Sequence, residues 1–378
     1  MQNRTRVLGL ILLLIVPFMA RGEIVKKMFE VSLPVVSQER DIRNAAFEQG
    51  FVDVLIRVSG SSQVASQIDT TRAARYVQQF RYRPLEQTAA SETTRPVGPT
   101  HGLAVDIQQP RYNLWLQFNE GKIKNLLREN SLPVWGKQRP SVLVWFAVRD
   151  GRNRYILRDQ DASAIKDAVN KVSERRGLPI LWPAFDNQDQ MSVSFTDVWG
   201  SFWGPIQQAS ERYKVEAIVV GRMDWQNGSW QVDWSMLLDN NSASWQLKAL
   251  DLELLMASGI NVATDQIARR FAVLEDVGNT GELQVQINGI REVDSYARIS
   301  RYLQSLAPVK NVFVTHIKDD VVRFHVGVTG DQNDLKRTIA LGKTLSPVQT
   351  IQPVINLKDP NSLLSLQQSG NVLTYTIN

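Results

Sequence analysis

The hydrophobic and polar positions of the chain repeat with two periods, one of two residues and one of about 3.6 residues. The run "SVLVWFAV" at 141–148 is continuously apolar, as expected for a strand that is buried on both faces. The following segment "DASAIKDAVNKVSERRG" places Ile165, Val169 and Val172 on one stripe and ends at Gly177. These patterns predict a buried strand followed by an amphipathic helix.

Further elements follow in the same region. The sequence predicts a second buried strand in "LPILWP", a helical region in "TDVWGSFWGPIQQASERY", and three strands in "KVEAIVVGRM", "GSWQVDWSML" and "SASWQLKALDL". Pro205 should kink or split the helical region, and a turn at Asn227 and Gly228 should join the first two of the three strands. A last helix in "INVATDQIARRFAV" completes the order βαβαβββα, which predicts a central α/β sandwich over 139–278.

Two smaller modules should flank this sandwich. A strand in "EIVKKMFEVSLPV", a helix that ends at Gly60, the strand "YNLWLQF" and the helix "EGKIKNLLREN" predict an N-terminal α/β domain over 23–138. The stretch 85–102 is polar and aperiodic, which predicts a mobile loop within that domain. The order βαββα, which begins with the strand "ELQVQINGI", predicts a ferredoxin-like module over 279–378, with "NVLTYTIN" as its final strand. The predicted fold class is therefore α/β, built from several small modules.

The first residues have the pattern of a secretory signal peptide. Two arginines precede an apolar run at 7–19, and a small-x-small site predicts cleavage before Glu23, so that 1–22 would be removed. An uncleaved membrane anchor is the alternative, but the run is shorter than the roughly 20 residues of a spanning helix, and Pro17 interrupts it. We therefore expect a periplasmic protein without a transmembrane span after cleavage.

Charge and cysteine content narrow the possible functions. The net charge is +5 and the pI about 9.3, which could favour anionic surfaces, but the basic residues are dispersed among acidic ones. No basic stripe or nucleic-acid-binding motif is present, so we expect no nucleic acid as a partner. The sequence has no cysteine, which excludes disulfides and thiolate metal sites. We expect no cofactor.

Several separate motifs occur in one order along the chain: "LPVWGKQRPSVLVWFAV", "RGLPILWPAFDNQDQ", "ASERYKVEAIVVGRM" and "VKNVFVTHIKDDVVRFHVGVTG". In this order they resemble the domain of unknown function (DUF) 2066 family of proteobacterial exported proteins. The resemblance covers nearly the whole chain after the signal segment and implies an exported protein. It implies no activity, substrate or site, because none is established for that family.

The segment "WPAFDNQDQMSVSFTDVWG" is the most site-like part of the sequence, because it gathers Asp186, Asp189 and Asp197 between tryptophans. Counted as a calcium loop from Asp186, it has Met191 where glycine should allow the sharp turn, and glutamines where charged ligands should lie. We therefore predict no metal there. The alternative is a turn at Asp186, followed by a helix that Thr196 or Asp197 caps. Loops after strands are also where open α/β sheets bind ligands, so the segment is a candidate binding surface.

The tryptophans offer a second candidate surface. All ten lie between Trp115 and Trp245, and Trp230 and Trp234 should share one face of a strand because they are four residues apart. Such residues could stack against the sugars of a cell-wall glycan, although large aromatic residues are more often part of a core. The candidate binding residues are Asp186, Asp189, Asp197, Trp199, Trp230 and Trp234.

No catalytic constellation emerges from the sequence. There is no G-x-S-x-G motif, and the earlier glycine of a P-loop falls on Arg337. His316 should face Arg323 in a hairpin rather than join a zinc site. Asp186 and Asp197 could serve glycoside hydrolysis only at a suitable separation. The sequence therefore favours a non-catalytic protein-interaction or envelope-assembly module that binds an envelope protein. The alternative is a peptidoglycan- or glycan-binding protein, possibly a hydrolase.

Overall fold

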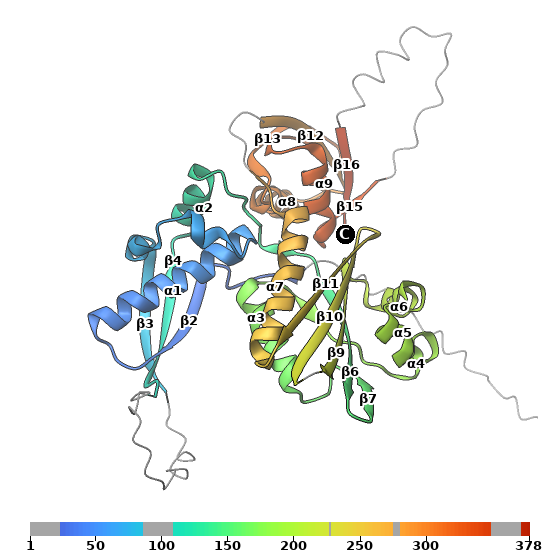
Figure 1. The fold of residues 1–378 in the computed structure, drawn as a ribbon. Helices are drawn as coiled ribbons and strands as arrows, with labels where there is room; N and C mark the ends of the chain where they lie inside the picture. The colour runs from blue at the N-terminus through green and yellow to red at the C-terminus, as the bar shows by residue number, and fades with distance from the viewer. Residues whose placement is uncertain (1–22, 86–108, 227, 275–279, 349–371) are drawn as a thin grey trace, which may run out of the picture.

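The structure is a computed structural model with an α/β architecture, as predicted (Figure 1). The predicted signal peptide 1–22 lies outside the described residues, and so does all of the predicted loop 85–102 except Leu85. Among the helices within the described residues, none is long and apolar enough to cross a membrane. The structure describes residues 23–85, 109–226, 228–274, 280–348 and 372–378.

The N-terminal part is a three-stranded antiparallel sheet covered by a long helix. The strands lie in the order β2-β4-β3, and the buried side chains of α1 pack on them together with α2. Helix α1 ends at Gly60, whose φ of 76° is the left-handed conformation that glycine adopts most easily. The elements are β2 (Glu30–Val35), α1 (Arg40–Ser59), the 3-10 helices η1 (Val64–Gln67) and η2 (Thr70–Arg75), β3 (Val77–Pro84), β4 (Tyr112–Phe118) and α2 (Glu120–Glu129).

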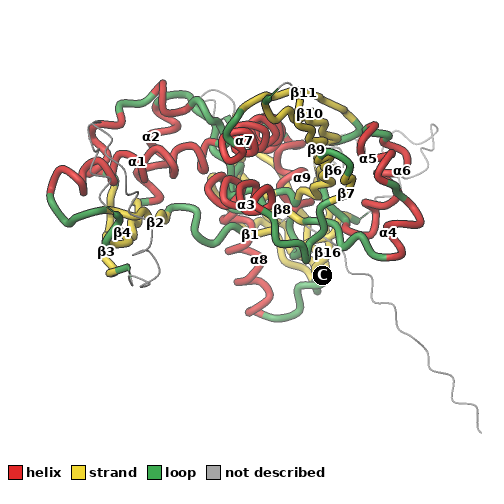
Figure 2. Tube along the Cα trace, turned by 60° about the horizontal axis from the view of Figure 1, so that its bottom comes forward, coloured by secondary structure: helices red, strands yellow, loops and turns green. Residues whose placement is uncertain are grey.

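The central part is a six-stranded sheet with helices on both faces. Its strand order is β11-β10-β9-β6-β7, with β8 beside the start of β6, and β6 runs parallel to β8 and β9. Figure 2 shows the strands between α3 and α7 on one side and α4, α5 and α6 on the other. The elements are β6 (Val142–Asp150), β7 (Asn153–Ile156), α3 (Ala164–Arg176), β8 (Ile180–Leu181), α4 (Asn187–Ser192), α5 (Phe195–Gly200), α6 (Trp203–Ser210), η3 (Glu211–Tyr213), β9 (Ala217–Gln226), β10 (Ser229–Leu238), β11 (Asn241–Ala249) and α7 (Leu252–Phe271).

Strand β6 is buried on both faces, as its continuous apolar sequence predicts. Val144 and Phe146 face the core under α3 and α7, whereas Leu143 and Trp145 face the core under α4, α5 and α6. Because alternate side chains of a strand point to opposite faces, only an apolar residue at every position can fill both cores. The prediction of a two-sided buried strand is confirmed.

Two predictions for the central part need correction. The second buried strand is only the two-residue β8, and Leu181 in it is exposed, because the chain pairs with β6 only at Val142 and Leu143. The single helical region is divided between α5 and α6, but the break lies at Ser201, with a φ of 53°, rather than at Pro205. Pro205 lies in the first turn of α6, where a helix needs no donor from it.

The C-terminal part has the predicted βαββα order and the predicted final strand, but a short strand, β15, that was not predicted comes between them in the sequence. Strand β16 is parallel to β12 and lies between β12 and β15, in the sheet order β13-β14-β12-β16-β15. His316 lies opposite Arg323 in the β13–β14 ladder, as the sequence predicts. The elements are β12 (Thr280–Asn288), α8 (Val293–Ser305), β13 (Val309–Lys318), β14 (Val321–Thr329), α9 (Gln332–Leu341), β15 (Leu345–Pro347) and β16 (Val372–Ile377).

Buried arginines join the N-terminal and central parts, where the short strands β1 (Glu23–Ile24) and β5 (Gln138–Arg139) also pair. The Nη2 of Arg176 donates to Asp265 Oδ1 at 2.6 Å and to the carbonyl of Gly60 at 2.7 Å, which ties α3 to α7 and to the end of α1. Arg139 is fully buried, stacks 3.6 Å from the ring centre of Trp135 and donates to the carbonyl of Arg57. Burial, together with the nearby arginines, lowers the pKa of Arg139.

Gly259 allows α7 to lie directly on the indole of Trp234 beneath it. A Cβ at position 259 would overlap that ring, whereas a Cβ at Gly204 in α6 would meet nothing within 4 Å. We predict that Gly259→Ala lowers the free energy of unfolding by about 2 kcal/mol through overpacking. Gly204→Ala should leave it unchanged or raise it by about 0.5 kcal/mol. Urea unfolding of both variants tests this, and equal effects would contradict the close packing.

Candidate functional site

The acidic segment folds as a small hydrogen-bonded cluster between α4 and η3. Asp189 is fully buried, and its carboxylate accepts hydrogen bonds from the Phe185 backbone at 2.8 Å, from Tyr213 Oη at 2.5 Å and from Arg212 Nη1 at 3.2 Å. Asp186 caps the start of α4 and is also held by Arg212, at 2.6 and 3.0 Å. Both carboxylates are thus engaged by the protein itself.

The electrostatics of the cluster fit a structural role. The bonds from Arg212 hold the pKa of Asp186 below its ordinary value. Burial and the bond to Asp189 raise the pKa of Tyr213, so its hydroxyl stays protonated and donates to that carboxylate. A general acid near neutral pH would need a carboxyl with a raised pKa. The low pKa of Asp186 is the opposite of that requirement.

Asp197 lies apart from this cluster, in the first turn of α5. Its Oδ2 accepts from the backbone of Ser194 at 2.8 Å and from Ser194 Oγ at 2.6 Å, and the Ser194 side chain accepts from the Asp197 backbone. The cap of this helix is therefore Ser194, not Thr196 or Asp197 as predicted, and Asp197 is the third-position partner of a capping box.

The candidate tryptophans occupy three different environments. Trp234 is fully buried beneath α7, and Trp230, on the same face of β10, is partly buried against the same core. Trp199 stacks on Phe195 on the other face of the sheet. All ten tryptophans lie within the described residues, and among them only Trp225 is exposed. The candidate residues therefore do not form one surface.

An ion pair contacts Trp199 on the face of the sheet that carries α4, α5 and α6. The guanidinium of Arg149 lies 4.6 Å from the ring centre of Trp199 and also bonds to Asp224. The bond from Arg149 lowers the pKa of Asp224 below its ordinary 3.8.

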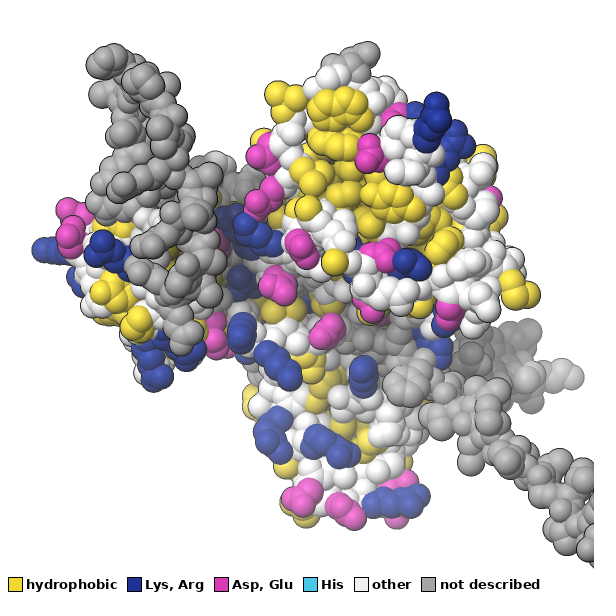
Figure 3. Space-filling view, turned by 90° about the horizontal axis from the view of Figure 1, so that it is seen from below, with side chains coloured by type: hydrophobic (Ala, Val, Ile, Leu, Met, Phe, Trp, Pro, Cys, Tyr) yellow, Lys and Arg dark blue, Asp and Glu magenta, His cyan; other side chains and the backbone are white. Residues whose placement is uncertain are grey.

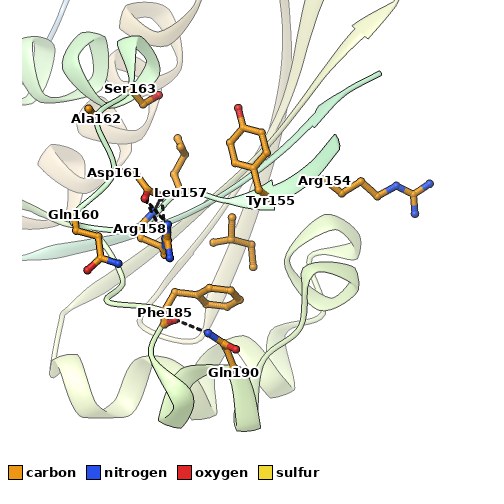
Figure 4. A pocket seen from close by; sticks show the side chains of 11 residues that line it. Arg154, Tyr155, Leu157, Arg158, Gln160, Asp161, Ala162, Ser163, Phe185 and Gln190 are labelled. Atoms are coloured by element: carbon orange, nitrogen blue, oxygen red, sulfur yellow. Dashed lines mark hydrogen bonds and ion pairs between the residues drawn. The ribbon is translucent and has the colours of Figure 1, made fainter. Parts of the chain in front are cut away.

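A groove of about 740 Å³ opens at the β7 edge of the central sheet (Figure 4). The loop before α3 forms one wall, and Phe185 and Gln190 form the other, where Gln190 Nε2 donates to the Phe185 carbonyl at 2.8 Å. The lining residues are Arg154, Tyr155, Ile156, Leu157, Arg158, Gln160, Asp161, Ala162, Ser163, Phe185 and Gln190.

The groove combines aromatic rings with amide and hydroxyl groups. Its carboxylate, Asp161, is paired with Arg158 at 2.8 Å, and hydrogen bonds from Arg158 lower the pKa of Asp161. Burial and nearby carboxylates raise the pKa of Tyr155, which keeps its hydroxyl protonated. The lining therefore offers hydrogen bonds and apolar contact to a ligand, and its carboxylate is not poised for proton transfer near neutral pH.

Exposed apolar side chains lie along the end of the central sheet where β6 and β9 finish, from Tyr155 in the groove at the β7 edge to Leu250 and Leu254, which follow β11 at the opposite edge. Trp225 is 48% exposed, Tyr155 42%, Leu250 75% and Leu254 61%. Trp230 pairs with Trp225 in the hairpin and touches it edge to face, with ring centres 4.9 Å apart. Figure 3 shows hydrophobic side chains gathered on this side of the molecule. We call the five residues Tyr155, Trp225, Trp230, Leu250 and Leu254 the apolar end.

Of the apolar end, the sequence predicted only Trp230 as a candidate binding residue, because Trp225, Tyr155, Leu250 and Leu254 belong to no acidic cluster and to no pair of tryptophans four residues apart. A signal was available, because a hairpin closed at Asn227 and Gly228 places Trp225 and Trp230 opposite each other. No local pattern in the sequence predicts that Leu250 and Leu254 lie at the same end of the sheet as Trp230. Their position depends on the pairing of β11 with β10, in which Ala249 lies opposite Trp230.

No group of three or more metal-binding side chains occurs in the part of the chain that the structure describes.

One family model, described as Domain of unknown function (DUF8605), matches residues 23–136. The prediction of the DUF 2066 family is therefore wrong. The motifs that suggested it lie almost entirely after residue 136, in strands, turns and helix ends whose patterns are common to many α/β sheets. No curated protein and no solved structure matches the chain.

The Arg149 to Asp224 pair gives a pH-dependent prediction. Since the folded-state pKa of Asp224 is lowered, the pair stabilises the fold above the ordinary pKa of 3.8, and this contribution is lost as pH falls through the lowered value. In Arg149→Met the pKa of Asp224 should rise toward 3.8. A carboxyl-carbon NMR titration measures it, and an unchanged pKa would contradict the pairing.

Proposed function

We propose that this protein is a non-catalytic interaction module of the cell envelope, which binds a partner protein through the groove and the apolar end. The observation that carries the proposal is the row of exposed apolar side chains that crosses this end of the sheet from the groove. Monomeric soluble proteins rarely expose contiguous apolar surface of this kind unless it serves an interaction. Tyr155 lines the groove and lies on the same face of the sheet as Trp225, with β6 between β7 and β9.

The position of this surface supports the proposal. It lies where the parallel strands β6 and β9 end, the place at which open α/β sheets bind ligands. Exposed aromatic residues are enriched at protein interfaces because they bury a large apolar area and keep a polar group in contact with water. Trp225 and Tyr155 have this character, and Arg154 and Arg158 supply a charged rim.

The envelope location rests on the amino-terminal sequence, with its arginines, apolar run and small-x-small site. We predict that the protein recovered from a periplasmic fraction begins at Glu23. Amino-terminal sequencing of the cell-extracted protein decides this. Recovery of the chain in the membrane fraction with residues 1–22 retained would show an anchored protein instead.

The partner-binding surface is tested by pull-down from intact cells after crosslinking. Trp225→Ala and Leu254→Ala remove exposed side chains at the apolar end, and we expect each to reduce partner recovery about tenfold or more, as loss of an interface anchor of at least 1.4 kcal/mol does. Phe313→Ala is the matched control, because Phe313 is 60% exposed on β13 of the C-terminal sheet.

A partner recovered equally well by all three variants would place its binding site elsewhere. Failure to recover any reproducible partner from crosslinked cells would count against an interaction module altogether.

Glycan binding has less support from the structure. A sugar platform needs exposed aromatic rings, and only Trp225 among the tryptophans is exposed. Titration of the protein with purified peptidoglycan fragments, followed by tryptophan fluorescence, tests this alternative. Saturable binding that Trp225→Ala abolishes would favour it over a protein partner.

A further inference from the structure

Edge strands expose unpaired backbone groups, and most edges in the described residues have features that prevent pairing with another chain. The edge strands β2, β3 and β15 each contain a proline, and β7 has only four residues. The register of β13 shifts twice, and this strand carries Lys310 and Lys318. Prolines, bulges, short length and lysines are the usual means by which proteins block edge-to-edge association.

Strand β11 has almost none of these features. Its nine residues, Asn241–Ala249, pair with β10 in unbroken register and include no proline. The outer edge of β11 is the end of the central sheet, and no other described strand pairs with it. Its single charged residue is Lys248. This edge is long and regular, and is therefore suited to accept another strand.

The two faces of β11 differ in a regular way. Ala243, Trp245, Leu247 and Ala249 are partly buried on the side of α7. The alternate residues on the other side, from Ser242 to Lys248, are exposed and polar. A strand added here must place its apolar side chains on the apolar face and its polar side chains on the polar face. A register slip of one residue would move every side chain to the opposite face of the sheet.

We propose that the occupant of this edge is β11 of a second copy of the chain, which pairs antiparallel about a two-fold axis at Trp245. This register pairs all nine residues, the largest overlap that two copies of the strand allow. It places Leu247 opposite Ala243 of the second copy on the apolar face. A two-fold interface of this kind brings the same surface of both chains together.

The charges of β11 fit this arrangement. In the register centred on Trp245, Lys248 lies opposite Ser242 of the second copy, so no like charges meet. The hydrogen bonds of the ladder would join two six-stranded sheets into one continuous sheet. The two Ala249 residues would lie about 27 Å apart along the strand direction, since antiparallel strands rise about 3.4 Å per residue. The dimer would thus present two apolar ends to a partner.

A pair of substitutions at one exposed serine tests the register. Ser242→Lys places a lysine opposite Lys248 of the other copy twice in each dimer, whereas Ser242→Glu places an opposite charge there. Sedimentation velocity of the full chain over a concentration series should show the unmodified protein at twice the mass of one chain. Ser242→Lys should raise the dimer dissociation constant about tenfold, and Ser242→Glu should lower it or leave it unchanged.

The difference between the two variants should shrink in high salt, because salt screens exposed charges. Ser242 is exposed, so we expect equal urea midpoints for all three proteins at a concentration at which each is monomeric, which would show that folding is intact. The proposal is overturned if the unmodified protein sediments as a monomer at every concentration. It is also overturned if the lysine and glutamate variants change the dissociation constant equally.

Discussion

The burial of β6 on both of its faces is the constraint on which the central part depends. From Val142 to Val148 every side chain of this strand is buried, and each large apolar side chain contributes about 2 kcal/mol when it is removed from water. Two helix layers are needed to bury it, α3 with α7 on one face and α4, α5 and α6 on the other. Since the faces near β6 are covered, the sheet can offer a binding surface only at its ends, its outer edge and the open side of β10 and β11.

The elements of the fold could be predicted from sequence wherever a pattern was long. The two-sided strand at 141–148, the helix that Gly177 ends and the facing of His316 and Arg323 follow from periodicity and turn chemistry alone. The predictions for "LPILWP" and the Pro205 helix were wrong in detail. The extent of β8 depends on how many residues of β6 are free to pair with it. The break before α6 depends on the left-handed backbone of Ser201, a conformation that a serine in the sequence does not predict.

The candidate site could not be predicted in the same way, because its geometry comes from contacts between distant residues. Asp189 is buried because Tyr213 and Arg212, more than 20 residues later, close over it. Trp234 is buried because Gly259 lets α7 approach it. The apolar end forms only when the β9–β10–β11 ladder sets Trp225, Trp230 and the end of β11 in one row across the sheet. Local sequence carries the residue types but not these distances.

Hydrogen exchange on the complex with a captured partner tests most directly whether the partner binds the groove and the apolar end. It reports where the partner covers the chain and requires no substitution. We expect slower exchange in the partner complex for the backbone amides of β7 and the loop before α3, of the end of β9 and the start of β10, and of the first turn of α7. Slower exchange confined to the C-terminal sheet, with unchanged exchange at these positions, would contradict it.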